Sequence, residues 1–242
     1  MYIGIIVKDR LDCLKVLLKS LQPNIENVRI VDASDKPLYD QVKEYLPGVR
    51  KYIHNSLPNF KSVNHNKNIL IHDFLMSGED YLFLIEDDVQ IINNDCFKEY
   101  IRISEKYKLV HLNAILKQDH KNYIKYTLAS EVDICNILYG YFSFYSRECV
   151  ETAGLYSTEL SNQCWEHIEY TARIHQKFDF KPEFFHFPDI KDSFKMIQYQ
   201  NAPTTSKTSK EIILQDKLKM FKMLKWKSFP TEVIKMIKLI NI

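Results

Sequence analysis

The sequence of 242 residues has few glycines and cysteines, and both shortages narrow the classes of protein that it can encode. Only five glycines are present, and no segment matches the phosphate-binding loops GxGxxG or GxxxxGK[ST]. A nucleotide would therefore have to bind without a glycine-rich loop. The five cysteines are scattered and form no CxxC pair, which indicates reduced thiols and argues against a zinc ribbon.

Long apolar runs are equally scarce. The opening run, YIGIIV, is followed at once by Lys8, Asp9 and Arg10, so it is far too short for the core of a signal peptide. No later run approaches the about 20 apolar residues that cross a bilayer. We therefore expect a cytoplasmic protein. The formal net charge of +2 gives no general signal for binding polyanions, and we predict no nucleic-acid partner.

Apolar segments of two different periods alternate through the first part of the chain. Continuous apolar runs rich in β-branched residues predict buried strands at 2–7, 27–32, 49–55 and 81–89. Apolar residues at helical spacing predict intervening helices at 11–21, 38–46 and 62–76. This alternation predicts an α/β fold with a Rossmann-like, mostly parallel, doubly wound sheet flanked by helices.

The second half of the chain has a less regular pattern. It predicts strands at 109–115 and 139–146, helices at 147–153 and 165–178, and an extended aromatic segment at 180–188. A polar linker follows, and the tail after it mixes lysines with apolar residues. We therefore predict one α/β domain over 1–200, followed by a linker and a basic, amphipathic helical extension over 201–242.

The strongest chemical signal is the run Glu86-Asp87-Asp88 after the apolar residues of the strand predicted at 81–89. Three adjacent carboxylates repel one another and are costly beside a dry core unless a cation neutralises them. A hard divalent ion, Mg²⁺ or Mn²⁺, suits these ligands and can also hold a diphosphate. A solvated turn is the alternative, which the apolar residues on both sides disfavour. Ligands of parallel sheets bind at the carboxyl ends of strands, where Asp32 also lies.

This segment resembles the GT-A fold glycosyltransferases, in particular their inverting, family-2-like members. YLFLIEDDV is similar to the DxD-type element of that family, with Glu86, Asp87 and Asp88 in its three places. The resemblance implies a donor site, in which Asp88 binds the metal and Glu86 and Asp87 contribute to cofactor binding.

Three further segments add residues to the donor site that the resemblance implies. IGIIVKDRLDCLKVLLKSL is similar to the first strand and helix of the family, with Arg10 in the place of an early arginine. IVDASD is similar to the VVDNGSxD element, so Asp32 would contact the nucleoside. VNHNKNIL is similar to a basic-Asn pair at a helix start, with His65 and Asn66 in those places.

The catalytic base would come from NQCWEHIEYTARIH, which is similar to the W-[GE]-E-D-x-[DE]-x-x-x-R segment of inverting members. Trp165, Glu166, Glu169 and Arg173 fall on the pattern, whereas His167 stands where an aspartate is common. A carboxylate or a neutral imidazole can take the proton of an acceptor hydroxyl. We predict Glu166 as the base, with His167 assisting or binding metal or phosphate. An ordinary amphipathic helix with a Glu169–Arg173 pair at i,i+4 is the alternative.

The resemblance also implies that the metal shell is completed from the region of FFHFPDIKDS, often by a histidine. His186 is the better ligand by type, because imidazole suits Mn²⁺, and Asp189 is the alternative. His186 could instead be packed among the aromatic residues. Weaker candidates for the acceptor side, which could equally be structural, are His111, Asn113, Tyr139, Tyr141, Trp165 and Tyr170.

Taken together, the resemblance implies a metal-dependent glycosyltransferase of hexosyl or N-acetylhexosaminyl type that inverts the anomeric centre. Its donor would be a nucleotide-sugar, by default a UDP-sugar, and its acceptor a glycan or lipid-linked glycan. Bacterial cell-surface polysaccharide, lipooligosaccharide and glycoprotein all remain open as products.

Alternatives are open both for the tail and for the activity. The basic tail predicts either peripheral contact with the inner face of the membrane or packing on the α/β domain or a second subunit. A nucleotidyltransferase also uses metal-bound acids on an α/β sheet, but it would usually have a glycine-rich segment near its first strand. A catalytically idle GT-A-like assembly or binding subunit is a further alternative for the activity, and His167 in the place of the base favours it.

Overall fold

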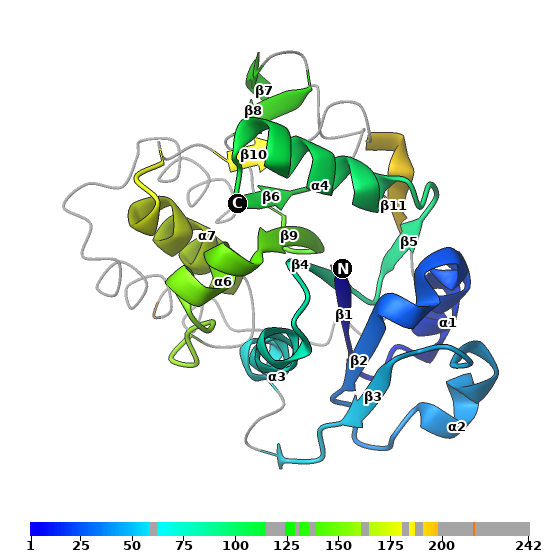
Figure 1. The fold of residues 1–242 in the computed structure, drawn as a ribbon. Helices are drawn as coiled ribbons and strands as arrows, with labels where there is room; N and C mark the ends of the chain where they lie inside the picture. Colours follow the sequence, from blue (N-terminus) through cyan, green and yellow to red (C-terminus); the bar gives the residue numbers. More distant parts are fainter. Residues whose placement is uncertain are drawn as a thin grey trace.

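In the part of the chain that the structure describes, six strands form a central sheet in the order β3-β2-β1-β4-β9-β6 (Figure 1). The neighbours from β3 to β4 run parallel, and β9 runs antiparallel to both β4 and β6. The strands of this sheet are β1 Tyr2–Val7, β2 Val28–Asp32, β3 Lys51–His54, β4 Tyr81–Glu86, β6 His111–Asn113 and β9 Phe142–Ser146. The mostly parallel α/β sheet expected from the alternating pattern is confirmed.

The structure is a computed structural model that describes most of the residues up to 197. The described residues are 1–58, 62–114, 124–128, 131–135, 139–160, 165–180, 184–186, 191–197 and 215. Only the backbone is described at 124–128, 135, 184–186 and 191.

Helices cover both faces of the sheet (Figure 1). The helices are α1 Leu11–Ser20, α2 Tyr39–Val42, α3 Val63–Ser77, α4 Cys96–Tyr107, α6 Arg147–Ala153 and α7 Glu166–Lys177, with short 3₁₀ turns at η1 Gln22–Asn27, η2 Lys43–Tyr45 and η4 Lys191–Ser193. One core lies between the sheet and α1, α2 and α4, and a second core lies between the sheet and α3, α6 and α7.

Alternate side chains of each strand enter the two cores. Ile3 and Ile5 of β1 pack in the first core, whereas Tyr2 packs in the second. Successive side chains of a strand point to opposite faces, so a strand that is covered on both faces must be apolar throughout. The continuous run YIGIIV meets that requirement.

Helix α3 is the element that matters most for the site, and its ends have clear chemical causes. The Ser62 side chain accepts a hydrogen bond from the His65 amide, which satisfies one of the free donors of the first turn. Gly78 ends the helix in the left-handed conformation at φ 75°. Between these ends, Leu70, Ile71 and Phe74 are buried against the sheet.

Two small sheets flank the central one. The first has the order β10-β8-β7, from strands Phe184–His186, Val132–Cys135 and Ile124–Leu128. The second pairs β5 Val89–Ile91 with β11 Phe194–Met196 in antiparallel register. Because β5 begins directly after Asp88, β11 lies beside the acidic residues: the Ile197 amide donates to the Asp88 carbonyl at 2.7 Å.

Two sequence-based boundaries were wrong. The single strand predicted at 81–89 is two strands with a turn at Asp87 and Asp88, because the repelling carboxylates leave the ladder at the edge of the sheet. The helix predicted at 38–46 is only α2 and η2, since just Leu38 and Val42 in this segment are buried and packing adds little to its stability.

Helix α4 was not predicted at all, although its buried residues recur at helical spacing. These residues are Cys96, Phe97, Tyr100, Ile103 and Ser104. The boundary between the predicted domain at 1–200 and the extension at 201–242 stays a prediction, because only Gln215 of the extension is described. Within the described residues, no helix has the length and apolar character needed to cross a membrane.

Candidate active site

The acidic turn, defined here as Glu86, Asp87 and Asp88, lies at the carboxyl end of β4. Strands β1 and β2 run parallel to β4, with Ile6 beside Glu86 and Val7 beside Asp32. The acidic turn and Asp32 therefore lie along the same edge of the sheet, as the sequence predicted.

Arg10 contacts two residues of the acidic turn. Its Nη1 lies 3.1 Å from Asp87 Oδ1 and 2.8 Å from Asp88 Oδ2. Arg10 is the residue that directly precedes α1. Burial raises the pKa of Asp87 to about 8, because the charge of Arg10 only partly offsets burial and the neighbouring Asp88 and Glu86 carboxylates raise the pKa further. A carboxyl with this pKa is largely protonated at neutral pH, so the three carboxyls of the turn need more positive charge than one guanidinium to be ionised together.

Asp88 has one oxygen that remains unused. Among the residues described, Asp88 Oδ1 is buried and has no hydrogen-bond partner. A hard cation fits this position, because Mg²⁺ and Mn²⁺ take oxygen ligands and keep several waters or substrate phosphates. No group of three metal-ligating side chains occurs among the described side chains, so Asp88 would share the ion with a substrate or with undescribed residues.

The side chains of the two other predicted metal ligands, His186 and Asp189, lie outside the described atoms. The backbone of His186 pairs with Asp133 in the three-stranded sheet, and its side chain is outside the described atoms. Asp189 lies outside the described residues altogether. Strand β11, a few residues further along the chain, returns to the acidic turn through the bond between Ile197 and Asp88. His186 and Asp189 both stay predicted metal ligands.

Glu166 and His167 form a second cluster at the start of α7. Glu166 is 5% exposed, and its Oε1 lies 3.4 Å from Lys67 Nζ and 3.5 Å from His167 Nδ1. The other carboxylate oxygen, Oε2, is buried without a hydrogen-bond partner in the described structure. Lys67 Nζ also lies 4.0 Å from Glu86 Oε1, so one ammonium joins the predicted base to the acidic turn.

The charges around Glu166 keep it ionised. Burial alone would raise its pKa, but the Lys67 ammonium and the His167 side chain lower the pKa well below its usual value. Gly140 packs against the His167 ring, and a Cβ at position 140 would meet ring atoms at 3.1 and 3.2 Å. The chain at Gly140 can therefore lie this close to the imidazole because Gly140 has no side chain.

Asp32 is fully buried, and both of its carboxylate oxygens accept hydrogen bonds. Its Oδ1 accepts from the Ser34 amide at 2.9 Å, and its Oδ2 accepts from the Leu38 amide and the Tyr52 hydroxyl at 2.8 and 2.5 Å. Asp32 thus organises the loop after β2, and its predicted contact with a nucleoside stays a prediction. The Asp9 amide donates to Ser34 Oγ, which ties this loop to the segment that carries Arg10.

His65 and Asn66 lie on the first turn of α3. His65 Nδ1 is 2.5 Å from Ser62 Oγ, and Asn66 Oδ1 accepts from Asn55 Nδ2 at 2.7 Å. The structure brings together Arg10 with Asp87 and Asp88, and, through Lys67, Glu86 with Glu166. The roles predicted for His65 and Asn66 stay predictions.

Other candidates have structural contacts. Glu169 and Arg173 form a two-pronged ion pair at 2.7 and 2.8 Å, as their spacing predicted. His111 is buried between the Phe144 carbonyl and Thr171, and its Nε2 also lies 2.9 Å from Asn113.

The four aromatic candidates are partly in the core. Tyr170 is buried with its hydroxyl on the Gly154 carbonyl, Tyr141 is buried, and Tyr139 is partly buried. Trp165 is buried too, but its Nε1 has no partner among the described residues. Of these four, Trp165 is the one with an unused polar group next to Glu166.

Lys67 was missed by sequence reasoning, although a signal was present. It precedes Leu70, Ile71 and Phe74 at helical spacing, so the pattern already places it on the buried stripe of α3. A lysine at such a position requires a partner, because an unpaired buried ammonium is strongly unfavourable.

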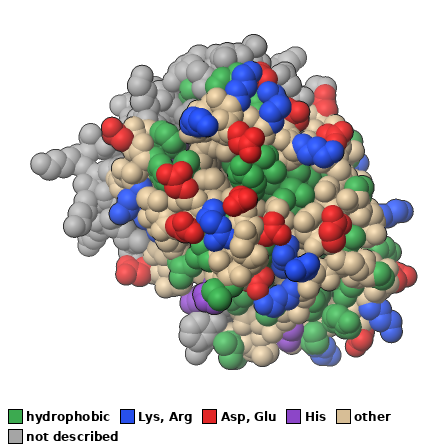
Figure 2. Space-filling model, viewed as in Figure 1, with side chains coloured by type: hydrophobic (Ala, Val, Ile, Leu, Met, Phe, Trp, Pro, Cys, Tyr) green, Lys and Arg blue, Asp and Glu red, His purple; other side chains and the backbone are tan. Residues whose placement is uncertain are grey.

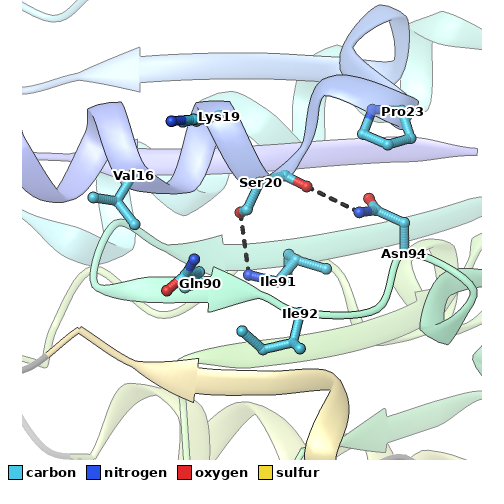
Figure 3. A pocket seen from close by; sticks show the side chains of 8 residues that line it. All are labelled: Val16, Lys19, Ser20, Pro23, Gln90, Ile91, Ile92 and Asn94. Atoms are coloured by element: carbon cyan, nitrogen blue, oxygen red, sulfur yellow. Dashed lines mark hydrogen bonds between the residues drawn. The ribbon is translucent and has the colours of Figure 1, made fainter.

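A cavity of about 620 Å³ lies elsewhere, between the last turn of α1 and β5 (Figure 3). Ser20 Oγ accepts from the Ile91 amide, and Asn94 donates to the Ser20 carbonyl. Of the described residues that line it, only Lys19 is charged. Across the face seen in Figure 2, acidic and basic side chains are interspersed. Neither feature offers the concentration of carboxylates found at the acidic turn.

Comparisons with solved structures identify the fold. The chain superposes on TarS 1–349 from S. aureus in complex with UDP-GlcNAc with a TM-score of 0.67 and 12% identity, over 93% of this chain and 65% of that one. GalNAc-T7 with UDP, GalNAc and Mn²⁺ gives 0.61 and 12%, over 91% and 48%. The mannosyltransferase PcManGT from Pyrobaculum calidifontis with GDP-Man and Mn²⁺ gives 0.58 and 10%, over 96% and 66%.

The chain therefore has the GT-A fold, as the resemblance implied. It spans between about half and two thirds of the length of these proteins. The sequence matches no family model and no curated protein sequence.

Proposed function

We propose that the protein is a nucleotide-sugar-dependent glycosyltransferase, which binds its donor at the acidic turn and its acceptor at Glu166. One observation carries the proposal. Glu166 is an ionised, buried carboxylate with one unpaired oxygen, and a single lysine connects it to the acidic turn at the carboxyl end of β4. The GT-A fold of the chain supports the same assignment.

On the donor side, the unpaired Asp88 Oδ1 and the crowded carboxyls of the acidic turn, which lack the positive charge to be ionised together, fit Mn²⁺ or Mg²⁺. When bound, such an ion supplies positive charge that stabilises a departing diphosphate. Arg10 already contacts Asp87 and Asp88, so its guanidinium can also face the diphosphate. Asp32 holds the loop after β2 in the conformation that would receive the nucleoside.

On the acceptor side, Glu166 Oε2 takes the proton of the attacking hydroxyl. The acceptor oxygen forms a bond to the anomeric carbon while the bond from that carbon to the diphosphate oxygen breaks. The nucleoside diphosphate leaves with the bonding electrons, and a single displacement inverts the anomeric centre. Trp165 Nε1 is an unpaired buried donor next to this base in the chain, and it can hold an acceptor oxygen.

The substrates proposed are a UDP-sugar, hexose or N-acetylhexosamine, and a glycan or lipid-linked glycan. Two of the similar structures contain UDP or UDP-GlcNAc, which supports uridine, whereas the third contains GDP-Man. Two contain Mn²⁺. The basic tail at 201–242 would bring the enzyme to an anionic membrane surface where lipid-linked acceptors reside.

The test is release of nucleoside diphosphate from a panel of UDP- and GDP-sugars with Mn²⁺ or Mg²⁺. We expect slow release from one donor by the wild-type protein, and loss of that release in Asp88→Ala. Lys98→Met, on an exposed side chain of α4, is the control variant and should keep wild-type release. Equal release by Asp88→Ala and wild type would refute the donor site.

A catalytically idle assembly or binding subunit is the second candidate. The observation that favours it is Arg10, whose guanidinium already occupies one oxygen of Asp87 and one of Asp88. His167 in place of the usual aspartate agrees with it. This candidate predicts that UDP or a glycan binds, detected by thermal shift, while no donor in the panel is turned over.

A further inference from the structure

Lys67 is a buried cation between the two halves of the proposed site. It lies on α3 and is 2% exposed, with Nζ 3.4 Å from Glu166 Oε1, 4.0 Å from Glu86 Oε1 and 5.1 Å from the centre of the Tyr156 ring. Removing an ammonium from water costs several kcal/mol, so a buried lysine persists only where carboxylates and a ring face compensate it. Lys67 is therefore kept in the interior by these two carboxylates and the Tyr156 ring.

The two carboxylates that share Lys67 are not equivalent. The side chain of Glu86 is 37% exposed, whereas that of Glu166 is 7% exposed. Water can solvate Glu86 when Lys67 is removed, whereas Glu166 would keep His167, at 3.5 Å, and its own backbone amide as compensating groups. The effect of Lys67 thus falls mainly on Glu166.

The geometry of Glu166 divides its two oxygens between two roles. Oε1 contacts Lys67 and His167, while Oε2 is left without a partner in the described part of the chain. A carboxylate held at one oxygen presents the other in a fixed direction. The holding group comes from α3 and the held group from α7, which lie on the same face of the sheet (Figure 1).

We propose that Lys67 is a positioning residue of the proposed glycosyl transfer, which holds Glu166 by Oε1 and so presents Oε2 to the acceptor hydroxyl. This assignment rests on the proposed function. Lys67 acts through Glu166 and touches no reacting atom, so removing Lys67 should lower kcat and leave the KM of the donor nearly unchanged. Removing Lys67 should cause no further loss of kcat in a variant whose Glu166 has already been neutralised.

The pH dependence follows from the groups that face Glu166. These groups are Lys67 from α3, Glu86 from β4, His167 from α7, Tyr145 from β9 and Tyr156. Without Lys67 the pKa of Glu166 rises, since burial then lacks its largest opposing charge. The two tyrosines, whose pKa values burial raises, stay neutral and do not oppose this rise. The acid limb of the pH–rate profile should therefore move to higher pH.

The experiment is a double-mutant cycle of Lys67→Met and Glu166→Gln on the full chain, with the donor that the wild type turns over. We expect Lys67→Met to lower kcat by about 10–100-fold, less than the about 10²–10⁴-fold loss on removing a general base. The double variant should be no slower than Glu166→Gln alone. Multiplied losses, or an unmoved acid limb in folded Lys67→Met, would overturn the assignment. Lys67→Gln replaces Lys67→Met if the latter does not fold.

A second readout separates this assignment from the proposed function. If the wild type turns over no donor, the transferase proposal fails, whereas the pKa of Glu166 can still be measured by ¹³C NMR. The Glu166 signal is identified by its absence in Glu166→Gln. A higher pKa in Lys67→Met than in wild type supports the holding contact, and equal values contradict it.

Discussion

Two glutamates on one helix, Glu166 and Glu169, should separate catalysis from stability. Both are buried on α7, and each faces a cation: Lys67 for Glu166 and Arg173 for Glu169. Glu166 has an unpaired oxygen, whereas both oxygens of Glu169 are held by Arg173. Replacing each by glutamine removes one charge and preserves the shape, so the two variants form a matched pair.

The expected magnitudes follow from these contacts. Arg173 also donates to the carbonyls of Ala153 and Leu155, so neutralising Glu169 leaves a guanidinium that is still hydrogen-bonded and partly exposed. The cost should be about 2–3 kcal/mol, between the values for surface and fully buried pairs. For a chain of this length that corresponds to a fall in Tm of about 4–12 °C. Glu166→Gln should instead lower kcat by about 10²–10⁴-fold.

The assay combines thermal unfolding with nucleoside diphosphate release at a temperature where both variants are folded. Glu169→Gln should keep nearly wild-type kcat per folded molecule. Glu166→Gln should also lower the Tm, because it leaves the buried Lys67 with the more exposed Glu86 as its nearest carboxylate, and it should lose kcat in molecules that are still folded. The reasoning is refuted if Glu169→Gln loses activity as severely as Glu166→Gln while both remain folded. It is equally refuted if Glu166→Gln retains wild-type kcat.

Two further variants test the parts of the site around these glutamates. Tyr52→Phe removes the hydroxyl that donates to Asp32. This loss should destabilise the fold by about 1.5–3 kcal/mol and raise the KM of the donor. An unchanged free energy of unfolding and an unchanged KM would contradict this expectation. Gly140→Ala forces a methyl group against the His167 ring and should lower kcat by less than the about 100-fold that a 1 Å misplacement costs; steady-state rates that match wild type would contradict a role for the imidazole.

The fold was largely predictable because its signals are local. The continuous run at Tyr2–Val7 and the helical spacing at Leu11–Ser20 indicated the correct elements. The turn at the acidic residues was not recognised, because Val89–Ile91 continues the apolar run that precedes it. The short helix Tyr39–Val42 was over-extended, since helical spacing alone does not say whether a segment is buried.

The candidate site was predictable where partners are near in sequence. The Glu169–Arg173 pair follows from i,i+4 spacing, which an isolated helix already satisfies. The contact between Lys67 and Glu166 joins residues 99 positions apart, and no periodicity in either helix indicates the other. Asp32 illustrates a second limit, because its residue type and place in a motif did not reveal that the loop itself uses both oxygens.

The most direct test of the donor site is an electron paramagnetic resonance titration of the protein with Mn²⁺ and UDP. We expect a bound-ion signal that strengthens when UDP is added, with coupling to ³¹P, and that is lost in Asp88→Ala. A signal that is identical in wild type and Asp88→Ala, or no bound ion with UDP present, would contradict the claim that Asp88 and its neighbours hold a cation against a diphosphate.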